Sequence, residues 1–203
     1  RPTALAVAAG AELVLNINAS PFHLGKHLER RKIVERRAIA GGVGVIYVNQ
    51  VGGQDELVFD GDSLVVDRAG EMAIGRDGTV AALAPHFEEG LYPVRITRDA
   101  QGHVAMLPGA VAPEPNLHAT VYAALVTGVR DYVNKNRFKG VVLGLSGGID
   151  SALTLAVAVD ALGPQRVDQL VERQLACLVR LERGLLDGRE QVDEARAARQ
   201  ARA

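Results

Sequence analysis

The first half of the chain alternates short apolar runs with one long, highly charged segment. Glycine, proline or polar residues bound each short run, which is typical of buried strands in an α/β protein. The charged segment 26–40 repeats apolar residues at helical spacing and ends at Gly41-Gly42, which predicts a helix. The strands predicted in this way are 13–18, 43–48, 57–59, 63–67 and 80–83, preceded by the end of a helix at 4–9.

The second half is predicted to begin with a linker and to continue as a strand between helices. Residues 98–118 are rich in proline and poor in large apolar side chains. A helix at 119–134, a strand at 141–145 and a helix at 151–161 follow. From Asp168 to Ala203 apolar spacing predicts a helix with a polar end rich in Ala and Arg. The expected apolar stripe of the first of these helices is Val121, Tyr122, Leu125, Val129, Tyr132 and Val133.

Gly144–Ser151 lies between the predicted strand and the helix that follows it, and its composition suits an anion site. Paired glycines let phosphate oxygens approach the backbone, and a helix N-terminus favours negative charge. Ser146 and Ser151 supply hydroxyl donors, and Asp150 suits a helix cap or a magnesium ion that travels with the phosphates. The segment has neither the lysine of a Walker loop nor the G-x-G-x-x-G spacing of a dinucleotide fold. A glycine turn without a ligand is the alternative.

The run Ser146-Gly147-Gly148-Ile149-Asp150-Ser151 resembles the S-G-G-x-D-S loop of ATP pyrophosphatases, which split ATP between its α and β phosphates. That loop is shared by several families, among them GMP synthetase, so it does not choose the acceptor by itself. The chain upstream resembles glutamine-dependent NAD synthetase, and the likeness covers roughly residues 1–167. The segments that carry it are 13–23, Gly25-Lys26, Arg30-Arg31, 45–61, 113–116 and 130–133.

This resemblance implies an enzyme that amidates deamido-NAD. A glutaminase site would release ammonia from glutamine, and a synthetase site would adenylate the nicotinate carboxylate with ATP, in the presence of Mg2+, before ammonia displaces AMP. The ATP-binding residues that it implies are Gly144, Leu145, Ser146, Gly147, Gly148, Ile149, Asp150 and Ser151. The alternatives are another ATP-pyrophosphatase amidotransferase, such as GMP synthetase, and a fragment that binds partners without turnover.

Ser20 and Lys26 match glutamine-binding positions of the family. Lys26 would pair with a ligand carboxylate and Ser20 would hydrogen-bond to it, although a solvated lysine and a capping serine are ordinary surface features. No catalytic residue is assigned, because the glutaminase Glu, Lys and Cys are expected upstream of Arg1. The single cysteine, Cys177, is expected to be a small apolar core residue. The isolated polypeptide is therefore expected to be incomplete and to lack glutaminase activity.

The predicted fold class is α/β: the C-terminal part of a nitrilase-like α/β sandwich, then the start of a doubly wound parallel sheet of the adenine nucleotide alpha hydrolase type. The predicted domains are 1–97 (nitrilase-like), 98–118 (linker), 119–167 (start of the synthetase domain) and 168–203 (divergent helical or disordered tail). Residues 67–78 resemble a hairpin enlarged by duplication. Asp62 stands where the family often has a small residue, so the conformation of that turn is not predicted.

Charge and composition place few further demands on the protein. The formal net charge is -1, with 23 basic and 24 acidic residues, so no nucleic-acid or membrane partner is expected. One cysteine fits a reducing, cytoplasmic location. The basic side chains of 26–40, Arg30 and Arg31 among them, are expected on a solvated helix face or at a subunit contact. A homo-oligomer is expected for the full-length enzyme.

Overall fold

The computed structural model describes residues 2–68 and 82–171 of the 203-residue chain. Its contacts divide it into two compact units, Arg1–Asn136 and Arg137–Ala203. The elements of the first unit are α1 (Pro2–Ala8), β1 (Leu13–Asn18), α2 (Lys26–Gly41), β2 (Gly44–Asn49), β3 (Val51–Gln54), β4 (Leu57–Asp60), β5 (Leu64–Val66), β6 (Ile96–Arg98), β7 (Val104–Met106) and α3 (Leu117–Lys135).

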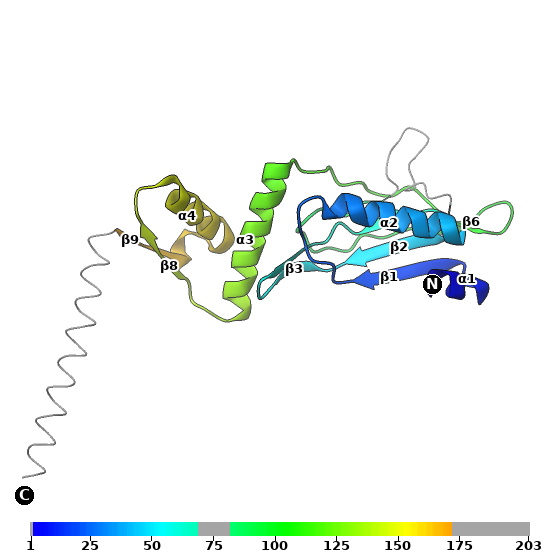
Figure 1. Cartoon of the computed structure of the whole chain (residues 1–203), viewed down its shortest axis with the longest axis horizontal. Coiled ribbons are helices and arrows are strands. Elements are labelled where there is room, and N and C mark those ends of the chain that lie inside the picture. Colours follow the sequence, from blue (N-terminus) through cyan, green and yellow to red (C-terminus); the bar gives the residue numbers. More distant parts are fainter. Residues whose placement is uncertain (1, 69–81, 172–203) are drawn as a thin grey trace, which may run out of the picture. The chain divides into compact units, whose positions relative to one another are not determined.

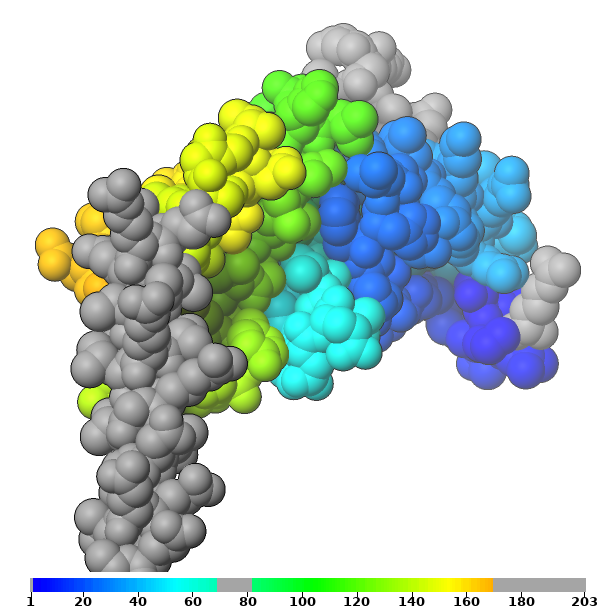
Figure 2. Space-filling view, turned by 60° about the vertical axis from the view of Figure 1, so that its left-hand side comes forward, coloured from blue at the N-terminus to red at the C-terminus, as the bar shows by residue number. Residues whose placement is uncertain are grey.

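A mixed three-stranded sheet, in the order β1-β2-β5, organises the first unit. β1 runs parallel to β2, with Leu13 opposite Gly44, and β5 is antiparallel to β2, with Leu64 opposite Tyr47. α2 lies across one face of this sheet (Figure 1) and its outer side faces solvent (Figure 2, blue). The core beneath α2 consists of Val34, Ala38, Val45, Tyr47, Leu64, Val66 and Leu83. These apolar side chains fix the register between the helix and the sheet.

The hairpin formed by β3 and β4 packs against α3 (Figure 1). A Cβ added at Gly53 would lie 3.3 Å from the Cα of Gly128, so the absence of a side chain permits this close approach. The Gly53 N–H donates to Asp131 Oδ2 at 2.7 Å, and Lys135 donates to the Gly53 carbonyl. Asn116 caps α3 by accepting from the N–H of Ala119. This helix is therefore held to the first unit along much of its length.

The second unit is a strand–helix–strand arrangement. It consists of β8 (Val141–Leu145), α4 (Ile149–Leu162), a 3-10 turn (Pro164–Arg166) and β9 (Val167–Val171). β9 runs parallel to β8, with Val167 opposite Val141, and α4 lies between the two strands in the chain. Such a crossover needs a helix because parallel neighbours cannot be joined by a tight turn.

Most of the predicted elements are confirmed, with shifts of one to three residues at their ends. The helix expected from Asp168 onward is wrong for residues 168–171, because these pair with β8 as a strand. Short apolar runs suit either structure, and the neighbouring parallel strand decides between them here. Residues 172–203, with Cys177, and most of the enlarged hairpin at 67–78 lie outside the described residues.

Two other expectations change. The stretch 98–118 contains β7, the end of β6 and the start of α3, because β-forming residues flank a Gln-Gly turn. The buried face of α3 is made of Thr120, Ala124, Thr127 and Val133, whereas Leu125 and Tyr132 are about half exposed. The predicted apolar stripe is therefore wrong at these two positions, because the glycine-rich β3 requires small side chains opposite it. In the described ranges no helix has the length and apolar character needed to cross a membrane.

Candidate functional site

The glycine loop connects the carboxyl end of β8 directly to the N-terminus of α4. Gly147 has φ 85, a left-handed conformation that side chains other than glycine rarely adopt. Ser151 Oγ lies 3.3 Å from Ser146 Oγ and donates to the Gly148 carbonyl at 2.9 Å. The two serines thus contact each other across a short loop, Ser146–Gly148, while Gly144 and Leu145 end β8 and Ile149–Ser151 begin α4.

The N-terminus of α4 has no side-chain cap. Gly148 occupies the cap position with extended angles, φ −84 and ψ 161, and contributes no side-chain acceptor to the first N–H groups. Ile149 is 81% exposed and Asp150 lies in the first turn, also exposed. Exposed backbone donors at a helix N-terminus, framed by two hydroxyls, form an arrangement that suits phosphate oxygens.

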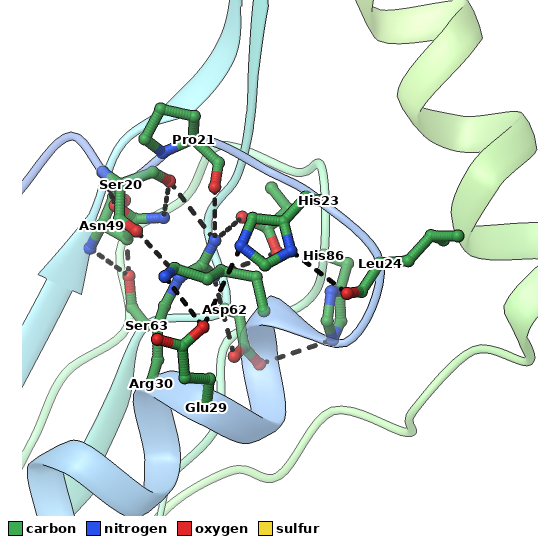
Figure 3. A network of polar contacts seen from close by, with 12 residues as sticks. Ser20, Pro21, His23, Leu24, Glu29, Arg30, Asn49, Asp62, Ser63 and His86 are labelled. Atoms are coloured by element: carbon green, nitrogen blue, oxygen red, sulfur yellow. Dashed lines mark hydrogen bonds and ion pairs between the residues drawn. The ribbon is translucent and has the colours of Figure 1, made fainter.

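The second candidate region is the Ser20 turn, residues 19–25, where β1 ends and leads to α2 (Figure 3). The side-chain amide of Asn49 holds the Ser20 backbone on both sides: Ser20 N donates to Asn49 Oδ1 at 2.8 Å, and Asn49 Nδ2 donates to the Ser20 carbonyl at 3.2 Å. Asn49 is itself buried at the end of β2. Because the parallel strands β1 and β2 end together, their last residues meet at the same edge of the sheet.

Ser20 and Lys26 line one cavity of about 600 Å³, which lies between α1, α2 and the face of β1 and β2. Lys26 begins α2, and its Nζ donates to Glu29 Oε2 at 2.9 Å. Arg30 and Tyr47 line the same cavity from deeper positions. The two predicted residues therefore line the same cavity.

A buried cluster of charged side chains lies beneath the Ser20 turn. Arg30 is 3% exposed and pairs with both oxygens of Asp60, at 3.0 and 2.6 Å. Arg31 donates to Asp62 Oδ1 at 3.1 Å and also to Glu114. His86 Nε2 lies 3.4 Å from Asp62 Oδ1. The expectation that the two arginines lie on a solvated helix face or at a subunit contact is wrong, because both are buried and pair with the buried carboxylates of Asp60 and Asp62.

Burial dominates the electrostatics of this cluster. It raises the pKa of the Asp62 carboxyl, in spite of the nearby charge of Arg31. Burial also lowers the pKa of His86, although Asp62 attracts the protonated ring. The hydrogen bond from Arg31 lowers the pKa of Glu114. Asp62 adopts a left-handed backbone conformation, φ 54, at a fully buried position shortly after β4.

The supporting residues Arg30, Tyr47, Asn49 and Asp60 were not predicted as parts of a site. One signal was available for Arg30, which lies four and eight residues before Val34 and Ala38 and so shares the buried face of α2. Nothing in the sequence pattern marked Asn49, because its role depends on the parallel pairing of β1 with β2. Among the described residues, no group of three or more His, Cys, Asp or Glu side chains is placed to hold a metal ion.

The fold and these two regions define an α/β protein of mixed sheets, with a glycine loop at the end of a parallel strand. Residues 121–173 match the family model described as NAD synthase. The chain is 46% identical over 166 residues to glutamine-dependent NAD(+) synthetase of Xylella fastidiosa strain Temecula1, covering 82% of this chain and 29% of that protein. It is 42% identical over 160 residues to the same enzyme of Acinetobacter baylyi, covering 79% and 28%. The chain therefore belongs to the glutamine-dependent NAD(+) synthetase family.

A solved structure agrees with this assignment. Glutamine-dependent NAD+ synthetase from Acinetobacter baumannii, in complex with ADP, matches with a TM-score of 0.71 and 41% identity, covering 82% of this chain and 30% of that one. The chain thus spans less than a third of the length of the relatives that it matches.

Proposed function

We propose that this chain is part of an enzyme that converts deamido-NAD to NAD with ATP and glutamine. In this reaction a carboxylate oxygen of the nicotinate group attacks the α-phosphorus of ATP, and pyrophosphate leaves. Ammonia released from glutamine then attacks the carboxyl carbon, and AMP leaves as the amide forms. Adenylation is needed because a carboxylate oxygen is otherwise a poor leaving group.

The observation that carries this proposal is the uncapped N-terminus of α4 behind the Ser-Gly-Gly loop, within the residues that match the NAD synthase model. We assign ATP phosphates to Gly144–Ser151, with backbone N–H groups and the hydroxyls of Ser146 and Ser151 as donors. The complex of the Acinetobacter baumannii relative with ADP supports an adenine nucleotide as the ligand of this family.

A magnesium ion fits the chemistry of this loop. Asp150 is an exposed carboxylate at the first turn of α4, and magnesium is commonly held by one or two carboxylates together with substrate phosphates. When bound, the ion would neutralise phosphate charge during adenylation. Asp150 would be the residue of this chain that holds it.

We assign glutamine to the cavity lined by Ser20 and Lys26. Lys26 supplies the positive charge for the ligand carboxylate, and Glu29 keeps its ammonium at the pocket edge through the 2.9 Å contact. The domain order expected from the sequence remains part of the proposal: a nitrilase-like sandwich over residues 1–97, a connecting segment over 98–118 that carries β7 and the start of α3, and the start of the synthetase domain over 119–167. We also propose that the enzyme is cytoplasmic and homo-oligomeric and has no nucleic-acid or membrane partner.

Titration of the chain with MgATP, followed by calorimetry, tests the nucleotide assignment. We expect saturable binding that is weaker than micromolar, because two strands form only a small part of a nucleotide-binding sheet. Ser146→Ala should weaken it about tenfold, the usual effect of one lost hydrogen bond to a charged group. Thr154→Ala is the matched control, since its hydroxyl donates to the Asp150 carbonyl one turn further along the helix. Lack of saturation, or equal losses in both variants, would contradict the assignment.

A further inference from the structure

We propose that Arg30 is a positioning residue that orients the Ser20 hydroxyl toward the glutamine carboxylate. This inference rests on the proposed glutamine site and adds a buried residue that contacts Ser20 from the core side. Arg30 Nε donates to Ser20 Oγ at 3.2 Å, and Arg30 Nη2 lies 3.3 Å from the Ser20 carbonyl (Figure 3). The same guanidinium is fixed in place by both oxygens of Asp60, which is 1% exposed.

The direction of the Ser20 hydroxyl follows from its hydrogen-bonding capacity. A serine hydroxyl has one donor and two acceptor lone pairs, whereas a guanidinium only donates. The contact with Arg30 Nε therefore uses a lone pair of Ser20 Oγ and leaves its hydrogen for another acceptor. An arginine at this position therefore leaves the Ser20 hydroxyl free to donate its hydrogen bond to a ligand.

Tyr47 lines the same cavity beside Arg30, and its phenol is buried. Burial raises the phenol pKa, so the ring keeps its proton at neutral pH. Because Arg30 Nε uses a lone pair of Ser20 Oγ, the Ser20 hydrogen remains available to an acceptor in the cavity, where a carboxylate is the complementary ligand.

Arg31 provides the control that separates positioning from support. It is the next residue of α2, is equally buried, and binds the carboxylates Asp62 and Glu114. Its contacts do not include Ser20 in the part of the chain that the structure describes. Arg30→Lys and Arg31→Lys thus each keep a buried positive charge and lose the rigid fork of the guanidinium, but only the first loses the contact with Ser20.

The test is a double-mutant cycle for L-glutamine binding, measured by calorimetry on the 203-residue chain at a temperature where circular dichroism shows every variant folded. Ser20→Ala should weaken binding at least about tenfold in the wild-type background. In the Arg30→Lys background the same change should weaken it by less than about twofold, because the hydroxyl is no longer oriented. In the Arg31→Lys background the full effect of Ser20→Ala should remain. Equal effects of Ser20→Ala in all three backgrounds would overturn the inference.

If the wild-type chain does not bind glutamine, the proposed glutamine site itself is contradicted. A second measurement then still tests the contact between Arg30 and Ser20. The Nε–H proton of Arg30 should be slow to exchange in NMR spectra, and Ser20→Ala should shift its resonance while the corresponding proton of Arg31 stays in place. An unchanged Arg30 resonance would show that the guanidinium does not bind the hydroxyl, and would overturn the positioning role independently of any ligand.

Discussion

The Ser20 turn and the Ser-Gly-Gly loop hold their polar groups in opposite ways. The Ser20 turn rests on buried side chains from α2, β2 and β4, so Arg30, Asn49 and Asp60 determine its shape. The loop before α4 is exposed, and its shape depends on local features: the left-handed conformation of Gly147 and the contacts of its two serines with each other and with the Gly148 carbonyl. A turn supported by a buried network is built before its ligand arrives, whereas an uncapped helix end leaves its donors for the ligand itself.

The largest expected difference between the two regions concerns arginine removal. Arg30→Ala would leave Asp60 buried without its partner, which should lower the free energy of unfolding by about 3–5 kcal/mol. Arg166→Ala, in the second unit, removes a half-buried guanidinium that donates to the carbonyls of Phe138 and Lys139, and should cost about 1 kcal/mol. Urea unfolding measures both. Equal losses would mean that the charge network does not support the first unit.

The backbone conformation of the loop predicts the next effect. Gly147→Ala places a Cβ on a left-handed residue and should destabilise the second unit by about 1–2 kcal/mol. Gly148→Ala is the comparison variant, because φ there is −84 and an added Cβ would meet only Ser146 Oγ at 3.6 Å, so its cost should be limited to about 0.5 kcal/mol for replacing a glycine cap with a poorer alanine cap. Thermal unfolding followed at the second unit distinguishes them. Similar costs at both glycines would show that conformation does not determine the loop.

The sequence predicted these two regions unequally, for physical reasons. The glycine loop is local, so the spacing from Gly144 to Ser151 was enough to place it between a strand and a helix. Ser20 and Lys26 were found by resemblance, but the side chains that support the turn come from residues 30 to 60 and meet only in the folded sheet. From sequence alone, a charged residue on a helix is predicted to face solvent unless its buried partner is known. This is why Arg30 and Arg31 were predicted to be exposed. β3 was missed because Val51-Gly52-Gly53-Gln54 has little strand propensity and is held by its contact with α3.

The pH dependence of stability tests the buried network around His86 and Asp62. Because burial lowers the pKa of His86 in the folded state, the unfolded chain binds a proton near pH 6.5 that the folded chain does not. The free energy of unfolding should therefore fall as the pH drops through about 6.5, by at most about 1.4 kcal/mol for each pH unit. Asp62 has the opposite effect on stability. Because burial raises the pKa of Asp62, the folded chain binds a proton that the unfolded chain does not, at pH values between the ordinary aspartate pKa and the raised one. In that pH range the Asp62 contribution increases the free energy of unfolding as the pH falls.

The comparison that isolates His86 is the difference between wild type and His86→Gln in urea unfolding from pH 7.5 to 5. The variant should lose less stability than wild type as the pH falls. His118→Gln, at the exposed start of α3, controls for the removal of a histidine as such. Parallel curves for wild type and His86→Gln would exclude a buried, proton-excluding histidine at this position.

The smallest predicted effect concerns the missing cap of α4. Gly148→Ser should stabilise the second unit by only a few tenths of a kcal/mol, because glycine is already a fair cap residue and its extended angles suit a serine side chain. The same hydroxyl would accept from the N–H groups that we assign to phosphate, so ATP binding should weaken while stability rises. Asn116→Ser, at the capped start of α3, should change neither property measurably. A Gly148→Ser variant that binds ATP as well as wild type would mean that the helix N-terminus is not where the phosphates bind.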